Sequence, residues 1–243
     1  MMPANSIKAL NRDLIDMLLK EMANRYRKID RKGYQPVEII IVGGGSVVLN
    51  YGFRPSTIDV DAIINASDSL KDIAIELSVK YEISSHWFNS DFTILPSYSP
   101  RLLEKSEFYK SYNNGKFNIR TVKAEFLIAM KMQSGRLYND DIPDVIGVIA
   151  SEKRNGNDIS FDKITAALLY LYGDKVSVSE DIMKRVSGYC ELSVDELWAE
   201  YDNIQNKTQS VKEEIMKDEN KEKIKGKQDA KELSQKLFEK LSQ

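Results

Sequence analysis

The run Val-Glu-Ile-Ile-Ile-Val at residues 37–42 leads directly into Gly-Gly-Gly-Ser at 43–46, and Arg-Pro-Ser-Thr-Ile-Asp-Val-Asp follows at 54–61. An apolar, β-branched run that stops at glycines is typical of a buried strand entering a tight turn. Residues 47–51 then predict a short helix. The alternation of side chains over residues 57–64 predicts a second strand. These elements indicate an α/β domain.

The glycine turn has the composition of a phosphate-binding loop. Glycines let backbone N–H groups approach a phosphate closely, and the N-terminus of the following helix adds a favourable dipole. Gly44 and Gly45 would supply such N–H groups, and Ser46 a hydroxyl donor. The alternative is a purely structural turn, which is common in α/β proteins. Neither Gly-Lys-Ser/Thr nor Gly-x-Gly-x-x-Gly occurs in the sequence, which excludes a P-loop and a dinucleotide fingerprint.

Two aspartates follow the turn at positions i and i+2 of the second predicted strand. Asp59 and Asp61 would leave the same face of that strand, roughly 7 Å apart at Cα. Two carboxylates on one face repel each other unless a cation lies between them. Mg²⁺ fits, because it binds one or two carboxylates together with substrate phosphates. The alternative is two exposed residues on an edge strand.

Together these residues resemble the signature of the DNA-polymerase-β-like nucleotidyltransferase superfamily, in which a strand, Gly45-Ser46 and a spacer precede Asp59-Val60-Asp61. The version Arg54-x-x-Thr57-x-Asp59-x-Asp61 is similar to the AbiEii-type branch, known as toxins of bacterial toxin–antitoxin and abortive-infection systems. The resemblance covers about residues 37–150. It implies a nucleotidyltransferase fold with a small mixed sheet, Mg²⁺ as cofactor, an NTP as substrate, and contacts from Arg54 and Thr57 to the nucleotide.

A second block supports the same branch. Residues 125–136 carry Lys131 within an apolar helical pattern, and Asp-Asp-Ile-Pro-Asp follows at 140–144. This resembles the Lys-bearing helix of that branch and its Asp-rich helix start. The resemblance implies that Lys131 contacts the nucleotide phosphates and that Asp144 is a functional carboxylate, with Asp140 and Asp141 as alternatives.

The second block also departs from the family pattern. Arg136 and Asp140 are separated by Leu-Tyr-Asn, and no motif marks a third metal carboxylate; Asp91 and Glu107 are candidates by position alone. Judged without the family, Lys131 reads as a solvated or snorkelling lysine. Arg54 reads equally as a turn cap or as a phosphate ligand, since its fork suits phosphate oxygens.

The remaining pattern divides the chain in two. We expect helices over 5–31, capped by Asn5 or Ser6, over 67–81, 122–135 and 141–151, and a hairpin around Asn113-Asn114-Gly115. A linker-like stretch at 152–158 precedes residues that read as helical to the end of the chain. We therefore expect a nucleotidyltransferase-like domain at 1–155 and a helical bundle domain at 156–243.

Composition limits the function classes. The 35 basic and 37 acidic residues give a net charge of −2, which argues against a protein that coats nucleic acid. One cysteine and one histidine exclude a disulfide framework and make a His-based metal centre hard to build. We see no signal peptide and no apolar run of about 18 residues, and we expect a cytoplasmic protein without membrane contact.

Residues 101–136 hold eight basic and three acidic side chains, with aromatics interleaved. Such a stretch suits single-stranded nucleic acid or an ordinary hairpin core about equally. The sequence as a whole favours an Mg²⁺-dependent enzyme that transfers NMP from an NTP; the resemblance implies an RNA or protein acceptor and a toxin with a cognate antitoxin. The alternative is a catalytically degenerate fold that binds nucleotide, RNA or a protein partner.

Overall fold

A computed structural model describes residues 8–29, 36–65, 69–135 and 141–215. Five strands form one sheet in the order β3-β2-β1-β5-β4. The central strand β1 runs antiparallel to β2 and parallel to β5; β3 is parallel to β2, and β4 is antiparallel to β5. This mixed sheet agrees with the predicted α/β class. The strands are β1 (Val37–Ile41), β2 (Val60–Asn65), β3 (Phe88–Asn89), β4 (Ser106–Tyr112) and β5 (Phe117–Val122).

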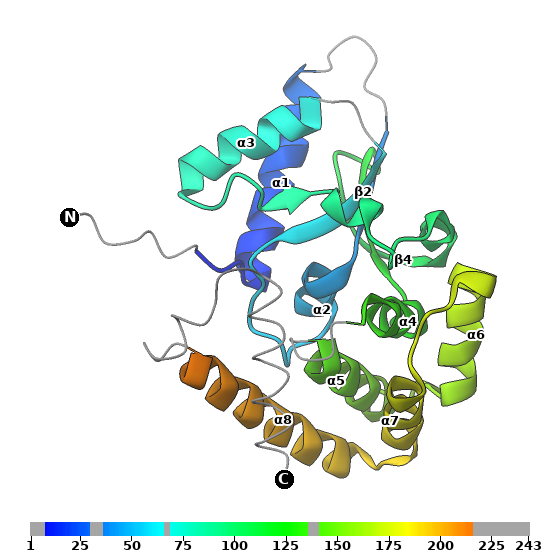
Figure 1. Cartoon of the computed structure of the whole chain (residues 1–243). Helices are drawn as coiled ribbons and strands as arrows, with labels where there is room; N and C mark the ends of the chain where they lie inside the picture. The colour runs from blue at the N-terminus through cyan, green and yellow to red at the C-terminus, as the bar shows by residue number, and fades with distance from the viewer. Residues whose placement is uncertain (1–7, 30–35, 66–68, 136–140, 216–243) are drawn as a thin grey trace.

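Helices cover both faces of the sheet (Figure 1). One layer contains α1 and α3, and the other begins with α4 and continues into α5–α8. The α-helices are α1 (Arg12–Ile29), α2 (Gly43–Asn50), α3 (Ser69–Tyr81), α4 (Ala124–Ser134), α5 (Asp141–Arg154), α6 (Phe161–Tyr172), α7 (Glu180–Glu191) and α8 (Val194–Ile215). The 3-10 helices are η1 (Asp91–Ile94), η2 (Pro100–Lys105) and η3 (Gly173–Lys175).

The alternation along the strands separates two apolar cores. Ile39 and Ile41 of β1 pack with α1 and α3, whereas Ile40 packs with α4 and the helices beyond it. In β2, Val60 and Ala62 belong to the first core. Because successive strand residues face opposite sides, Asp61 lies on the face that α4 covers. The strand period thus places this carboxylate on the same side of the sheet as the Lys-bearing helix.

The second core is continuous across the predicted domain boundary. It joins buried residues of α4 and α5 with buried residues of α6, α7 and α8, including Leu127, Ile146, Ile164, Val186 and Leu197. The division at residue 155 stays a prediction, as does a separate helical bundle. The C-terminal helices nevertheless contribute to the packing that surrounds α4 and α5.

Several element boundaries differ from the sequence expectation. The first helix begins at Arg12, because the Asn11 side chain accepts a hydrogen bond from the Leu14 N–H (2.9 Å) and caps it, while Leu10 forms a β-bridge with Thr57. The expected caps Asn5 and Ser6 lie outside the described residues. The strand expected from Thr57 begins at Val60, so Asp59 lies just before it.

Further differences follow from the same local chemistry. The glycine turn is itself the first turn of α2. Helix α5 continues to Arg154 and shortens the expected linker at 152–158. Residues 216–243, expected to be helical, lie outside the described residues.

The hairpin is confirmed, and its aromatics serve mostly as core. Asn113 and Asn114 have φ of 55°, as the turn requires. The hydroxyls of Tyr109 and Tyr112 both donate to Asp16 of α1, and Phe117 is fully buried. Phe108 is exposed at a β-bulge of β4. These contacts favour the hairpin-core interpretation of the basic, aromatic stretch.

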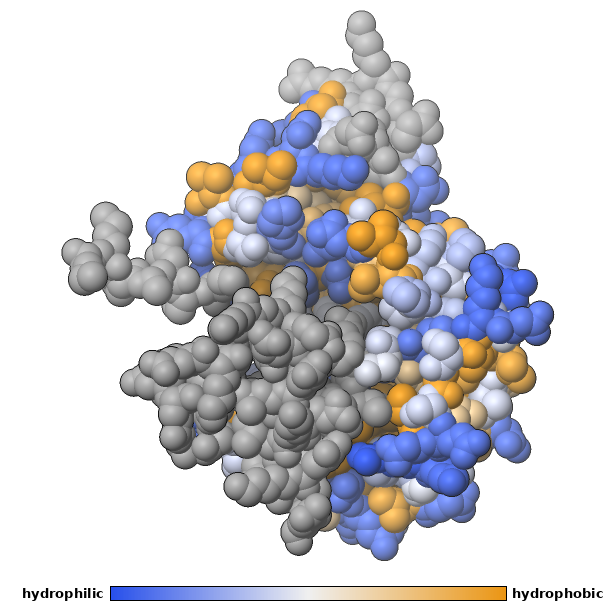
Figure 2. All heavy atoms as spheres, in the orientation of Figure 1, coloured by the Kyte–Doolittle hydropathy of each residue, from blue (hydrophilic) through white to orange (hydrophobic). Residues whose placement is uncertain are grey.

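The visible surface mixes apolar and polar residues (Figure 2). On α3, for example, Ile75 and Val79 are exposed among the charged residues Lys71, Asp72 and Glu76. Scattered apolar side chains are ordinary on a protein surface. Within the described ranges, no helix combines the length and the apolar character that a bilayer crossing needs.

Glu21 connects α1 to α3 and generates a prediction about acid stability. Its carboxylate accepts hydrogen bonds from Arg25, Lys80 and Tyr81. Burial raises the pKa of Glu21, but these three donors together lower it to about 2. Because the folded-state pKa is depressed, the stabilisation is complete above the ordinary pKa near 4.5 and is lost as the pH falls toward 2.

We therefore expect Glu21→Gln to reduce the free energy of unfolding at pH 7 by about 1 kcal/mol, since partial exposure screens these charges. The deficit relative to wild type should shrink between pH 4.5 and pH 2, the interval between the two pKa values. Urea unfolding at pH 7 and pH 3.5 measures it. The matched control is Glu76→Gln, a more exposed partner of Arg25, which should change little. A deficit independent of pH would contradict the assignment.

Candidate functional site

The glycine turn opens helix α2 without a side-chain cap. Val42, the N-cap residue, is extended, and no described side chain accepts a hydrogen bond there. The first helical hydrogen bond runs from the Ser46 N–H to the Val42 carbonyl (3.3 Å). The N–H groups of Gly43, Gly44 and Gly45 therefore precede the helical ladder, where donors point out of the helix end. Such an end attracts an anion.

Asp61 of β2 lies beside this helix end. The Asp61 carbonyl accepts a hydrogen bond from the Val42 N–H (2.9 Å), so the two strands hold Asp61 next to the start of α2. Its carboxylate Oδ2 is 3.5 Å from the position that a Cβ would take on Gly43. Gly43 also has φ +57°, which disfavours any other residue. Asp61 is half-buried, and Asp59, two residues earlier, is exposed.

Arg54 and Thr57 close over the next glycine. A Cβ on Gly44 would lie 2.9 Å from Thr57 Oγ1 and 3.1 Å from an Arg54 guanidinium nitrogen. A side chain at Gly44 would therefore displace both groups. Gly45 is packed against Ile41 and Val60, which fixes α2 to the sheet. A side chain at Gly43 or Gly44 would therefore disturb the candidate site, whereas a side chain at Gly45 would disturb the packing of α2 on the sheet.

A buried ion-pair network continues from Arg54. The Arg54 guanidinium donates to Asp144 Oδ2, and the Lys131 ammonium lies 2.7 Å from the same carboxylate oxygen. Lys131 also donates to Asp141 Oδ1 at 2.7 Å. The side chains of Lys131 and Asp144 are only 7% and 3% exposed. Two cations and two carboxylates from three chain segments therefore meet beside the glycine turn.

The charge state of Lys131 follows from these partners. Burial by itself lowers the pKa of the ammonium, but the carboxylates of Asp144 and Asp141 oppose it and leave the pKa raised. Because the folded-state pKa is raised, the ion pair persists at neutral pH and fails only in strongly alkaline solution. Burial and pairing contradict the alternative of a solvated Lys131.

Helix α5 holds the segment that carries Arg54. The Tyr51 hydroxyl donates to Glu152 (2.8 Å), Phe53 covers Gly147, and Arg54 reaches Asp144. Residues 51–54 therefore run antiparallel to α5 and meet it about once per turn. The position of the guanidinium depends on this whole strip of contacts.

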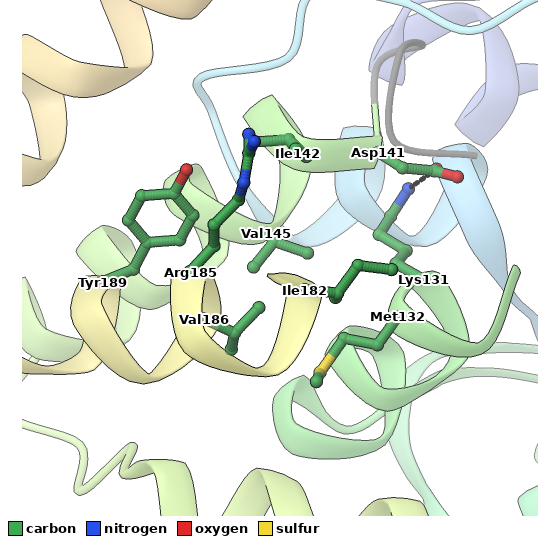
Figure 3. Close-up of a pocket in the computed structure, with 9 residues that line it drawn as sticks. All are labelled: Lys131, Met132, Asp141, Ile142, Val145, Ile182, Arg185, Val186 and Tyr189. Carbon is green, nitrogen blue, oxygen red and sulfur yellow. Dashed lines mark hydrogen bonds and ion pairs between the residues drawn. The ribbon is translucent and has the colours of Figure 1, made fainter. Parts of the chain in front are cut away.

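An apolar pocket lies on the other side of the Lys131–Asp141 pair (Figure 3). Side chains of α4, α5 and α7 line it, and Lys131 and Asp141 lie at one end while Arg185 and Tyr189 lie at the other. The wall between these ends is formed by Met132, Ile142, Val145, Ile182 and Val186. Helix α7 thus places apolar side chains beside the Lys131–Asp141 ion pair, and the low local dielectric strengthens the attraction between the two charges.

The described residues contain no group of three His, Cys, Asp or Glu side chains that could hold a metal. Glu107 interacts electrostatically with Glu152, which accepts a hydrogen bond from Tyr51 at the end of α2 opposite the glycine turn. Asp91 is exposed at the start of η1. Neither joins Asp59 and Asp61. Asp61 beside the glycine turn, with Asp59 two residues earlier in the chain, still fits Mg²⁺, which can bind one or two carboxylates and complete its shell with phosphate and water oxygens.

Two neighbours of the site were not found from the sequence. Asn89 is in parallel register with Asp61, but its strand is only two residues long and gave no periodic signal. Phe53 fills the notch at Gly147; a glycine inside a helical pattern was the one available signal. Among the sequence candidates, Ser46 is fully buried, and its hydroxyl has no hydrogen-bond partner among the described residues.

A family model described as "Nucleotidyltransferase of unknown function (DUF6036)" matches residues 17–185. The chain belongs to this family. No curated protein and no solved structure matches it. The DUF6036 match spans the glycine turn, Asp59, Asp61 and the Lys131 network, and it supports the predicted nucleotidyltransferase family. The AbiEii-type branch remains a prediction. Asp140 and Arg136 of the second block lie outside the described residues.

The network predicts a large stability effect at Asp144. We expect Asp144→Asn to lower the free energy of unfolding by about 3 kcal/mol, because it leaves Arg54 and Lys131 buried with one fewer carboxylate. Urea unfolding measures the loss. The matched control is Asp158→Asn, whose exposed pair with Lys163 should contribute less than about 0.5 kcal/mol. Equal effects of the two substitutions would contradict the inferred role of Asp144.

Proposed function

We propose that this DUF6036 protein transfers a nucleoside monophosphate from an NTP to an acceptor hydroxyl, with Mg²⁺ as cofactor. The observation that carries the proposal is the convergence of Gly43–Gly45, Asp61 and Arg54 at one helix end, with Lys131 linked to Arg54 through Asp144. A phosphate-binding backbone, carboxylates and two cations are the components that phosphoryl chemistry requires.

Each group has a role in this proposal. The N–H groups of Gly44 and Gly45, with the Thr57 hydroxyl, bind the phosphates, and Arg54 and Lys131 neutralise their charge. The Ser46 hydroxyl supplies a further hydrogen-bond donor at the turn. Asp59 and Asp61 hold Mg²⁺, which supplies Lewis-acid stabilisation of the phosphate oxygens. Asp144 orients the two cations toward the phosphates.

The proposed reaction is an in-line displacement. The acceptor oxygen forms a bond to the α-phosphorus, its proton passes to solvent, and the bond from the α-phosphorus to the oxygen that bridges to the β-phosphorus breaks. Pyrophosphate departs, and the acceptor retains the NMP. By the motif resemblance the acceptor is an RNA, including tRNA ends, or a protein side chain, and the protein is a toxin with an antitoxin partner.

A second candidate is nucleotide binding without catalysis. It is favoured by the lack of a three-carboxylate group among the described residues. This alternative keeps the phosphate-binding roles of the glycine turn, Arg54 and Lys131. It predicts NTP binding without release of pyrophosphate.

Labelling with each α-³²P NTP, Mg²⁺ and total cellular RNA tests the proposal. We expect wild type to label RNA or protein. Asp59→Asn and Asp61→Asn should each reduce labelling about a hundredfold or more, because each removes a proposed ligand of the Mg²⁺ that stabilises charge on the reacting phosphates. The matched control is Asp72→Asn, an exposed aspartate of α3, which should label normally.

The outcomes separate the two candidates. No labelling with intact Mg²⁺-dependent NTP binding would favour the binding protein. Equal labelling by wild type and both site variants, at equal thermal stability, would remove Asp59 and Asp61 from the site.

A further inference from the structure

Helix α8 lies C-terminal to both the sequence motifs and the residues that the family model matches. The DUF6036 match ends at residue 185, whereas α8 spans Val194–Ile215. Two of its aromatic residues, Trp198 and Tyr201, nevertheless contact the segment between α2 and β2. That segment carries Arg54.

We propose that Trp198 and Tyr201 of α8 are positioning residues of the nucleotide site, which lock Phe53 against α5 and thereby hold Arg54 beside the glycine turn. The inference rests on the proposed function, because it concerns how Arg54 binds phosphate. Neither α8 residue would touch the nucleotide itself.

Ring contacts form the lock. The Phe53 ring centroid is 5.8 Å from that of Trp198 and 5.5 Å from that of Tyr201, and both pairs are edge-to-face. Trp198 and Tyr201 also contact each other edge-to-face at 5.4 Å. Edge-to-face contacts of this kind are a favoured arrangement of aromatic pairs. The Tyr51 ring adds a fourth contact to Phe53 at 5.9 Å.

Gly147 of α5 provides a further contact for the Phe53 ring. A Cβ at this position would lie 2.5 Å from two atoms of the Phe53 ring, which is closer than a Cβ approaches a non-bonded atom. The ring therefore fits only because α5 has no side chain there. Phe53 therefore contacts both the α5 backbone at Gly147 and the two α8 rings.

Tyr201 also connects the rings to the charged network. Burial raises the pKa of the Tyr201 hydroxyl, the hydrogen bond from Gln205 lowers it, and the charges of Asp144 and Arg54 act on it in opposite directions. The hydroxyl thus lies within electrostatic reach of the Arg54–Asp144 pair. It accepts from Gln205 (3.1 Å) and lies 3.5 Å from the Phe53 carbonyl.

The link from Phe53 to Arg54 is covalent and short. An arginine is long and has many rotamers, so its guanidinium is placed well only when its backbone is fixed. Phe53 is the adjacent residue, and Asp144 receives the guanidinium only three residues before Gly147. A shift of the Phe53 ring therefore moves the backbone from which Arg54 reaches Asp144 and Gly44.

The experiment compares Trp198→Ala with two matched variants. Trp198→Phe keeps an aromatic ring at the contact with Phe53; it shortens the bicyclic indole and removes an N–H that has no hydrogen-bond partner among the described residues. Leu197→Ala creates a cavity in the same helix, one residue away and outside the ring cluster. A purely structural role of α8 would make Leu197→Ala and Trp198→Ala equivalent.

The first readout needs no nucleotide. Hydrogen exchange of a peptide covering residues 51–57 should accelerate about tenfold in Trp198→Ala and stay near wild type in Trp198→Phe and Leu197→Ala. Equal acceleration in Trp198→Ala and Leu197→Ala, or none in Trp198→Ala, would overturn the inference whether or not the protein binds NTP.

The second readout is the affinity for Mg²⁺·ATP and Mg²⁺·GTP. Trp198→Ala should weaken it about tenfold, because a displaced cation contributes little to phosphate binding. In an Arg54→Ala background, Trp198→Ala should cause no further loss, since the effect travels through Arg54. A loss of equal size in both backgrounds would overturn the inferred route. If wild type itself binds neither nucleotide, the proposed function fails, and exchange alone decides the role of α8.

Discussion

The carboxylate of Asp144 is the point on which the candidate site depends. It receives Lys131 from α4, and it receives Arg54 from the α2–β2 connection, 90 residues before Asp144 in the chain. Without it, two cations would repel each other in a place that water barely reaches. A buried pair of this kind compensates its desolvation only when every charge is well partnered. Asp141 supplies the second partner to Lys131 and completes the balance.

Helix α5 translates that electrostatic requirement into geometry. Its first turn carries Asp141 and Asp144, its middle carries Gly147, and its last turns carry Glu152. Each position meets a different residue of the 51–54 segment or of α4. Helix α5 thus fixes the spacing between the charged network and the aromatic cluster of α8. Apolar packing from α6, α7 and α8 holds α5 in place.

Local patterns were sufficient for the parts of the fold that depend on local chemistry. The apolar run before the glycines, the Asn-Asn-Gly hairpin and the periodic helices follow from spacing, and all are present. The motif resemblance pointed to Arg54, Lys131 and Asp144 separately, but no pattern could show that one carboxylate joins the other two. Phe53 and Gly147 were missed for the same reason, since a contact between distant segments leaves no periodic trace. The start of α1 was misplaced because a cap and a bridge to Thr57 competed with an apolar pattern that extended further.

The two edges of the sheet have a consequence for how this protein behaves at high concentration. An exposed, regular edge strand offers unpaired N–H and C=O groups to a second chain and invites intermolecular sheet formation. Here one edge, β3, is only two residues long, and the other, β4, is interrupted by a bulge between Phe108 and Lys110. A bulge twists the strand away from a flat template, and Lys110 adds a charge at the same place. The short length of β3 and the bulge of β4 therefore both discourage self-association through the sheet.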